Sequence, residues 1–172
     1  MNGNIDIMEE TKENITTGKI RKLMEDVYDP EIPVLSIIDL GIIRDIHLNN
    51  DVVEVFITPT YSGCPAMDVI SMNIRLALLE NGFKKIKITQ HLSPAWTTDW
   101  MTENGKEKLK AYGIAPPVGK SFDKKYLEEL KIECPLCHSI NTKLISQFGS
   151  TACKALYQCN DCLEPFDYFK CH

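Results

Sequence analysis

The feature that most constrains this chain is a doubled Cys-x2-Cys motif near its C-terminal end. Cys134 and Cys137 form the first pair, and Cys159 and Cys162 form the second, with 21 residues between the pairs. Each pair can form a knuckle that holds two thiolates about 2.3 Å from one zinc ion, and two knuckles complete a tetrahedron. Unrelated buried cysteines rarely repeat this spacing. The motif therefore predicts a zinc ribbon with these four cysteines as ligands.

A zinc ion with four thiolate ligands has no open coordination position, so we expect a structural site rather than a catalytic one. The ribbon module is short and contains little apolar material, so metal binding supplies much of its stability. Residues 142–147 and 155–158 have the strand character expected between two knuckles. The aromatic side chains within residues 165–169 either close the small ribbon core or belong to a surface that docks a partner.

The charge of the chain argues against nucleic acid and membranes as partners. Its 172 residues include 19 Lys and Arg against 24 Asp and Glu, a net charge of −5. Such a chain lacks the positive field that attracts nucleic acid or anionic lipid. Residues 1–14 contain neither the basic nor the apolar region of a signal peptide. We therefore expect a cytoplasmic protein, in which the seven cysteines bind metal, react or fill cores rather than form disulfides.

The sequence before the ribbon predicts an α+β domain. In chain order the expected elements are a helix capped by Thr16 or Thr17 and stopped by Pro30, strands over 42–48 and 52–58, a helix over 66–81, a strand over 84–91, and a helix over 98–112. Residues 49–51 are typical of a turn, which predicts an antiparallel hairpin of the first two strands. The order helix–strand–strand–helix–strand–helix indicates a small sheet with flanking helices.

The chain is expected to divide into four segments. Residues 1–15 are polar and acidic and form a flexible arm. Residues 16–115 form the α+β domain. Residues 116–132, which include two adjacent prolines and a charged run, form a linker. Residues 133–172 form the zinc ribbon.

Cys64 is the second candidate site. It directly precedes Pro65 at the start of a predicted helix, where free backbone N–H groups favour the thiolate and predict a thiol pKa below ~8.5. A thiolate binds iron or zinc, and it is also the form that attacks. An inert buried cysteine is the alternative. Asp29, Glu31 and Asp39 lie near Cys64 if the first helix packs beside the hairpin; otherwise they serve turns and helix caps.

Several segments of the chain resemble a known family. Residues 29–33, 39–42 and 58–66 resemble the corresponding motifs of iron–sulfur cluster assembly domains. Residues 94–100, residues 113–117 and the ribbon with residues 146–155 are similar to the family of accessory proteins, called D or J, of bacterial phenylacetyl-CoA epoxidase systems. The resemblance covers about residues 17–170.

This resemblance implies an accessory protein that helps to assemble or repair an iron–sulfur or iron centre. It implies the oxygenase or reductase subunits of the epoxidase system as partners, and transient binding of iron or an iron–sulfur cluster beside the structural zinc. The family's candidate iron or cluster contacts fall on Cys64, Asp29 and Glu31. Homo-oligomerisation and the role of Cys153 stay open. Cys171 does not fit the family pattern and is interpreted as a surface thiol without a role rather than as a stray soft ligand.

An enzyme component that uses Cys64 as a reactive thiol is the alternative function. The sequence contains no Glu-x-x-His pair for a di-iron site, no phosphate-binding glycine loop and no flavin fingerprint. We therefore expect a protein without catalytic activity of its own.

Overall fold

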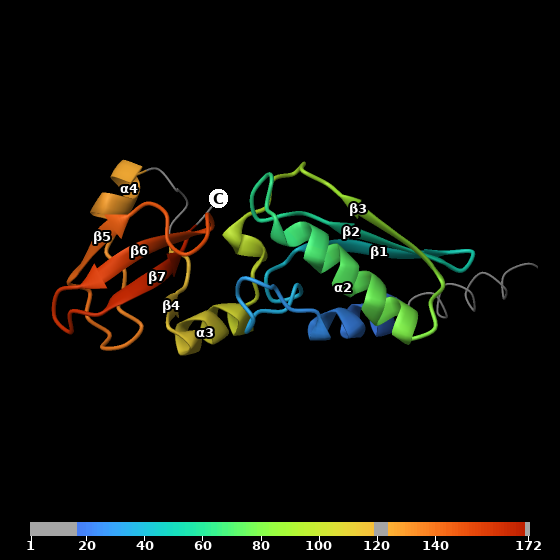
Figure 1. Cartoon of the computed structure of the whole chain (residues 1–172), viewed down its shortest axis with the longest axis horizontal. Coiled ribbons are helices and arrows are strands. Elements are labelled where there is room, and N and C mark those ends of the chain that lie inside the picture. The colour runs from blue at the N-terminus through green and yellow to red at the C-terminus, as the bar shows by residue number, and fades with distance from the viewer. Residues whose placement is uncertain (1–16, 119–123, 171–172) are drawn as a thin grey trace, which may run out of the picture.

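The computed structural model describes residues 17–118 and 124–170, and the structural statements below concern these residues. They form two lobes (Figure 1). The larger lobe contains a three-stranded sheet with helices, and the smaller lobe contains a four-stranded sheet. The predicted fold class, α+β with a C-terminal ribbon, is confirmed. Residues 1–15, predicted to be a flexible arm, and Thr16, a predicted helix cap, lie outside the described residues.

The sheet of the larger lobe has the strand order β1–β2–β3. Its strands are β1 (Ile43–Asn49), β2 (Val52–Ile57) and β3 (Lys85–Gln90). β1 and β2 form the predicted antiparallel hairpin, and the turn residues Asn50 and Asp51 both have positive φ angles. Val53, Val55 and Ile57 are fully buried, because alternate side chains of a strand point to the same face.

Helix α2 (Ala66–Glu80) packs on this sheet and connects β2 to the parallel strand β3 (Figure 1). A parallel pair needs such a crossover, because a tight turn would reverse the chain direction. The helix buries residues that recur at three- or four-residue spacing, together with its first residue: Ala66, Met67, Ile70, Ile74 and Leu78. Gly82 has a positive φ just after the C-cap residue Asn81 and ends the helix, close to the predicted end at residue 81.

A shorter helix precedes the sheet. Residues 17–23 are helical and continue into a 3-10 turn, η1 (Met24–Asp26). Ile20, Met24 and Val27 are buried in the core, in agreement with the predicted apolar spacing. Every helix of the described residues is too short or too polar to cross a membrane.

The predicted helix over residues 98–112 is wrong in its first part. Residues 98–100 form a separate 3-10 turn, η2 (Thr98–Trp100), and α3 (Glu103–Tyr112) begins only after Thr102. The Thr102 hydroxyl accepts the Gly105 N–H at 2.9 Å and caps α3, so the helix starts at this residue. Gly113 ends α3, so the predicted end of the helix at residue 112 is confirmed. Tyr112, at the end of α3, is 53% exposed.

Gly41 allows the segment before β1 to approach η2 closely. Its φ is +67°, and a Cβ at this position would overlap the backbone carbonyl of Trp100. The Arg44 guanidinium lies over the Trp100 ring, 3.4 Å from its centroid. The Trp96 indole N–H donates to the Leu40 carbonyl at 2.8 Å. Two segments that carry the family resemblance therefore pack against each other.

The sheet of the smaller lobe has the order β4–β7–β6–β5. Its strands are β4 (Ile114–Ala115), β5 (Thr142–Ser146), β6 (Lys154–Cys159) and β7 (Pro165–Phe169), with helix α4 (Lys124–Glu129) beside them. Tyr157, Phe166 and Tyr168 are buried together with Leu127 of α4. Two of the three aromatic side chains of β7, Phe166 and Tyr168, therefore close this core, which is the first of the two roles considered for them.

Two segments that we predicted outside the ribbon contribute to its lobe. β4, at the end of the predicted α+β domain, pairs with β7. Helix α4, inside the predicted linker over residues 116–132, places Leu127 in the ribbon core. The division of the chain into independently folding units remains a prediction.

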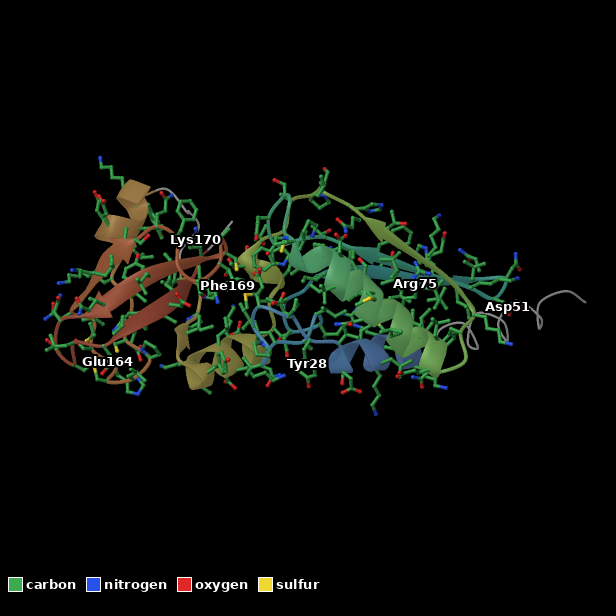
Figure 2. All side chains as sticks on the ribbon, viewed as in Figure 1. Tyr28, Asp51, Arg75, Glu164, Phe169 and Lys170 are labelled. Carbon is green, nitrogen blue, oxygen red and sulfur yellow. The ribbon has the colours of Figure 1, made fainter. Side chains whose placement is uncertain are left out.

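A shared core joins the two lobes. Phe169 at the end of β7 contacts Trp96, with ring centroids 6.1 Å apart. Both residues, and Cys153 from the loop before β6, belong to the buried cluster of the larger lobe. The Lys170 N–H donates to the Cys153 carbonyl at 2.9 Å. Figure 2 shows Phe169 and Lys170 at the junction, on the side where the N-terminal end of α2 approaches the smaller lobe.

Candidate functional site

The structure brings the four ribbon cysteines together at one end of the smaller lobe. The thiol sulfurs of Cys134, Cys137, Cys159 and Cys162 all lie within 4.8 Å of one another. The Cys134 and Cys162 sulfurs are 3.8 Å apart, and those of Cys137 and Cys159 are 3.5 Å apart. Four sulfurs at about 2.3 Å from a central ion stand about 3.8 Å apart in a tetrahedron. This donor set therefore fits a bound metal ion.

Turns around the cysteines hold the two knuckles in place. The His138 N–H donates to the Cys134 carbonyl at 3.0 Å, and His138 has a positive φ of 62°. The backbone N–H of Cys162 is the main cause that lowers the pKa of the Cys159 thiol. The His138 side chain points to a different partner from its backbone, since its Nδ1 lies 2.8 Å from the Glu133 carboxylate. The imidazole is thus engaged outside the four-sulfur set, as expected from the complete number of cysteine ligands.

A polar network connects the two knuckles to each other. Asp161 accepts hydrogen bonds from the Ser139 hydroxyl and, at 2.8 Å, from the Asn141 amide. The Asn160 amide donates to the Asn141 side-chain oxygen at 3.0 Å. These bonds fix the second knuckle relative to the first, which sets the distances among the four sulfurs.

Cys64 lies at the N-terminal end of α2, as predicted, and is half-buried. The prediction that its thiol pKa is lowered is wrong. Burial raises the pKa of Cys64, and the negative charges of Glu31 and Asp29 raise it further. The Ala66 N–H and the Tyr61 hydroxyl, which both donate to the sulfur, lower the pKa but do not outweigh burial. The thiol, not the thiolate, is therefore the favoured form near neutral pH.

Asp29 and Glu31 lie close enough to Cys64 to act on its thiol electrostatically. Asp29 is only 8% exposed, and its Oδ1 accepts the N–H groups of Glu31 at 2.8 Å and Ile32 at 2.9 Å. Burial raises the pKa of both carboxyl groups. Asp29 therefore has both roles that the sequence left open: it caps the proline-rich turn, and it lies near the Cys64 thiol.

Asp39 serves a different purpose. Its carboxylate accepts hydrogen bonds from Lys108 Nζ at 2.6 Å, Thr102 Oγ1 at 3.0 Å and Asn104 Nδ2 at 3.1 Å, and from the Ser36 hydroxyl at 3.1 Å. These partners come from α3 and its cap and from the turn before Gly41. Asp39 therefore anchors α3 to the larger lobe, which is the capping role considered from the sequence.

Sequence reasoning missed two residues that the structure places beside this region. Cys153 and Lys154 are each 4% exposed. The charge of Lys154 lowers the pKa of Asp29 and Glu31, and the charges of these two carboxylates raise the pKa of the Cys153 thiol. The Thr151 hydroxyl lies 3.0 Å from the Cys153 sulfur. Cys153 and Lys154 both lie within the segment over residues 146–155, which carries part of the family resemblance. The resemblance gave no role to either side chain, so it did not identify them.

Family models match two parts of the chain. Residues 18–85 match the model described as "Iron-sulfur cluster assembly protein", and residues 119–170 match the model described as "PaaD zinc beta ribbon domain". The first match contains Asp29, Glu31 and Cys64, and the second contains the four ribbon cysteines together with Cys153.

Individual proteins show the same two relationships. A protein of Escherichia coli (strain K12), provisionally named as the D component of 1,2-phenylacetyl-CoA epoxidase, is 50% identical over 153 residues, which cover 89% of this chain and 92% of that protein. An Fe-S protein maturation auxiliary factor of Porphyromonas gingivalis (strain ATCC BAA-308 / W83) is 36% identical over 96 residues, 55% of this chain and 90% of that protein. A solved Bacillus anthracis domain of unknown function, DUF59, superposes with a TM-score of 0.55 at 24% identity over 58% of this chain and 96% of that one, which supports the fold of the larger lobe.

Proposed function

Because the chain belongs to the family of 1,2-phenylacetyl-CoA epoxidase D components, we propose that it is a non-catalytic accessory protein of such a system. It assists the assembly or repair of an iron–sulfur or iron centre, and the oxygenase or reductase subunits that contain this centre are its partners. The match of residues 18–85 to iron–sulfur assembly proteins and the similarity to a maturation factor support this role.

The four ribbon cysteines hold one structural zinc ion. The zinc ribbon model that matches this segment supports zinc, and the spacing of the sulfurs fits a tetrahedral ion. Zinc with four thiolate ligands has no position for a substrate, so its contribution is to hold β5, β6 and β7 together. The ribbon thereby keeps Phe169 and Cys153 in contact with the larger lobe.

The observation that carries the proposal is the surroundings of Cys64. A half-buried thiol stands beside two carboxyl groups with raised pKa values, in the lobe that matches iron–sulfur assembly proteins. Thiolate and carboxylate are ligands for iron, and they bind it by releasing protons. Iron or a cluster is the cargo at this place, contacted by Cys64 and Glu31, with Asp29 beside them.

The same surroundings disfavour the alternative, an enzyme component that uses Cys64 as a reactive thiol. A nucleophilic cysteine needs a lowered pKa, because the thiolate is the reacting form. Burial and two nearby carboxylates raise the pKa of Cys64 instead. This electrostatic setting suits a thiol that is deprotonated only when a cation arrives.

Purification without oxygen, followed by metal analysis and an absorbance spectrum, tests the proposal. One zinc per chain indicates an adaptor, and additional iron with sulfide indicates a carrier; both agree with an accessory role. The purified chain is expected to leave an aromatic CoA thioester unchanged when reductant and oxygen are supplied. Steady conversion by the chain alone would overturn the proposal.

A further inference from the structure

Cys153 belongs to the smaller lobe by sequence but to the larger lobe by packing. It precedes β6 and is 4% exposed. Its side chain is part of the buried cluster that also contains Trp96 and Phe169, and Cys64 and Tyr61 pack against this same cluster. The two lobes therefore each contribute one cysteine to a common interface.

The two thiols share their electrostatic neighbours. Glu31 and Asp29 raise the pKa of the Cys64 thiol and also that of the Cys153 thiol, after burial as the largest cause for each. The pKa of Tyr61 is raised first by burial, then by its hydrogen bond to Cys64, and also by the charge of Cys153. Two thiols and two carboxyl groups from separate parts of the chain therefore lie within electrostatic range of one another at the interface.

A buried lysine compensates the charge at this place. Lys154 is 4% exposed, whereas the equally buried Lys170 donates to the Gln147 carbonyl at 2.9 Å. Lys154 lowers the pKa of Asp29, Glu31 and Cys153 through its charge. Lysines are rarely buried so completely without an anionic partner. Asp167, at 3.7 Å from Lys154, is one such partner, and the carboxyl groups of Asp29 and Glu31 also interact with its charge.

We propose that Cys153 is the second thiol ligand at the Cys64 site, so that the two lobes together bind one ferrous ion through Cys64, Cys153 and Glu31. This inference rests on the proposed function, because it specifies how the iron cargo is held. Asp29 is a positioning residue, since its Oδ1 already accepts the Glu31 and Ile32 N–H groups. Binding converts two thiols to thiolates and releases two protons to solvent, without oxidation of either sulfur.

The charge of the filled site is consistent with its surroundings. Two thiolates, one carboxylate and Fe²⁺ sum to about −1, which the Lys154 ammonium balances. Without an ion, the ligand atoms of Cys64, Cys153 and Glu31 are farther apart than they would be around a bound metal. In residues 17–118 and 124–170, the ribbon cysteines are the one group that brings three or more ligand atoms within 4.8 Å of one another. A small shift of the ribbon on the larger lobe, or rotation of the thiols, must therefore accompany binding.

Cobalt(II), which gives thiolate charge-transfer absorption, is a suitable probe for this site. The full chain is first loaded with zinc so that the ribbon is occupied, and Co²⁺ is then added without oxygen. We expect one further Co²⁺ per chain with a thiolate absorption band. Cys64→Ser and Cys153→Ser should each weaken this binding at least tenfold and reduce the band, with the zinc content unchanged. Cys171→Ser, which also removes one thiol, should retain both.

A thiol-bridging reagent provides a second test that needs no variant to fold. Dibromobimane joins two nearby thiols into a fluorescent adduct, and peptide mapping of the zinc-loaded wild-type chain should show Cys64 linked to Cys153. A band that survives in Cys153→Ser, or that Cys171→Ser removes, would overturn the proposal, and so would the absence of a link between Cys64 and Cys153. A Cys153→Ser chain that lacks the cobalt site in vitro but still supports the oxygenase in cells would show that iron is not delivered through Cys64 and Cys153. If the wild-type chain itself does not support the oxygenase in cells, the proposed function is refuted instead.

Discussion

Replacing Asp39 by Asn tests whether a single buried carboxylate holds α3 on the larger lobe through its charge. The side chain is only 7% exposed, and its shortest contact is the 2.6 Å ion pair with Lys108. Asn retains the shape and one acceptor oxygen but loses the negative charge. The difference between the two proteins therefore isolates the electrostatic part of this network.

The magnitude follows from the pKa of Asp39. Burial raises this pKa, but hydrogen bonds from Lys108, Asn104, Thr102 and Ser36 outweigh burial and lower it from the ordinary 3.8 to about 2. One pKa unit corresponds to about 1.4 kcal/mol, so the ionised form stabilises the fold by about 2 kcal/mol. Since the folded state has the lower pKa, this stability is present above about pH 4 and is lost as the pH falls towards about pH 2.

The assay is urea unfolding followed by tryptophan fluorescence at several pH values. Both tryptophans, Trp96 and Trp100, lie in the larger lobe, so the signal reports on the part that Asp39 stabilises. We expect Asp39→Asn to be about 2 kcal/mol less stable than wild type near pH 6, with the gap closing as the pH approaches about 2. Asp51→Asn, in the exposed β1–β2 turn at the far end of the lobe (Figure 2), is the matched control and should show no such gap. A gap that is absent at pH 6, or that does not change with pH, would refute the reasoning.

Three further changes test other parts of the structure. Cys137→Ser should lose the zinc and unfold the ribbon lobe, because three thiolates hold the ion poorly; full zinc occupancy by elemental analysis would contradict the ligand assignment. Gly41→Ala should lower the free energy of unfolding by about 2 kcal/mol or more, because a Cβ there meets the Trp100 carbonyl at a positive φ, and an unchanged urea midpoint would count against this close approach. Trp96→Phe should cost about 1–3 kcal/mol, because the buried Leu40 carbonyl loses its donor, and a loss no larger than that of an exposed substitution would contradict it.

The parts of the fold that the sequence predicts are those with a local signal. The alternation of Val53, Val55 and Ile57 predicts β2, and Gly82 marks the end of α2, because each depends on a few adjacent residues. The four ribbon cysteines are predictable as a group for the same reason, since the two knuckles repeat one short spacing. The cap at Thr102 was missed because it lies four residues inside the predicted helix over 98–112. A single capping residue is a weaker signal than the apolar periodicity on which that helix was predicted.

The candidate site at the interface depends on contacts that no local pattern contains. The helix N-terminus suggested a lowered pKa for Cys64, but burial and the carboxyl groups of Asp29 and Glu31 have the larger effect. Both carboxyl groups come from a turn more than thirty residues earlier in the chain. Cys153 comes from the other lobe, and its place beside them follows only from the docking of Phe169 against Trp96.

We propose that this chain supplies or restores the metal centre of a partner and performs no oxygenation itself. The most direct measurement is the iron content and activity of the oxygenase and reductase subunits purified from bacteria that lack this chain. We expect these subunits to be present at normal levels but deficient in iron or cluster. The wild-type gene should restore them, and a Cys64→Ser gene whose product is stable and zinc-replete should not. Fully metallated, active subunits in the absence of the chain would contradict the account.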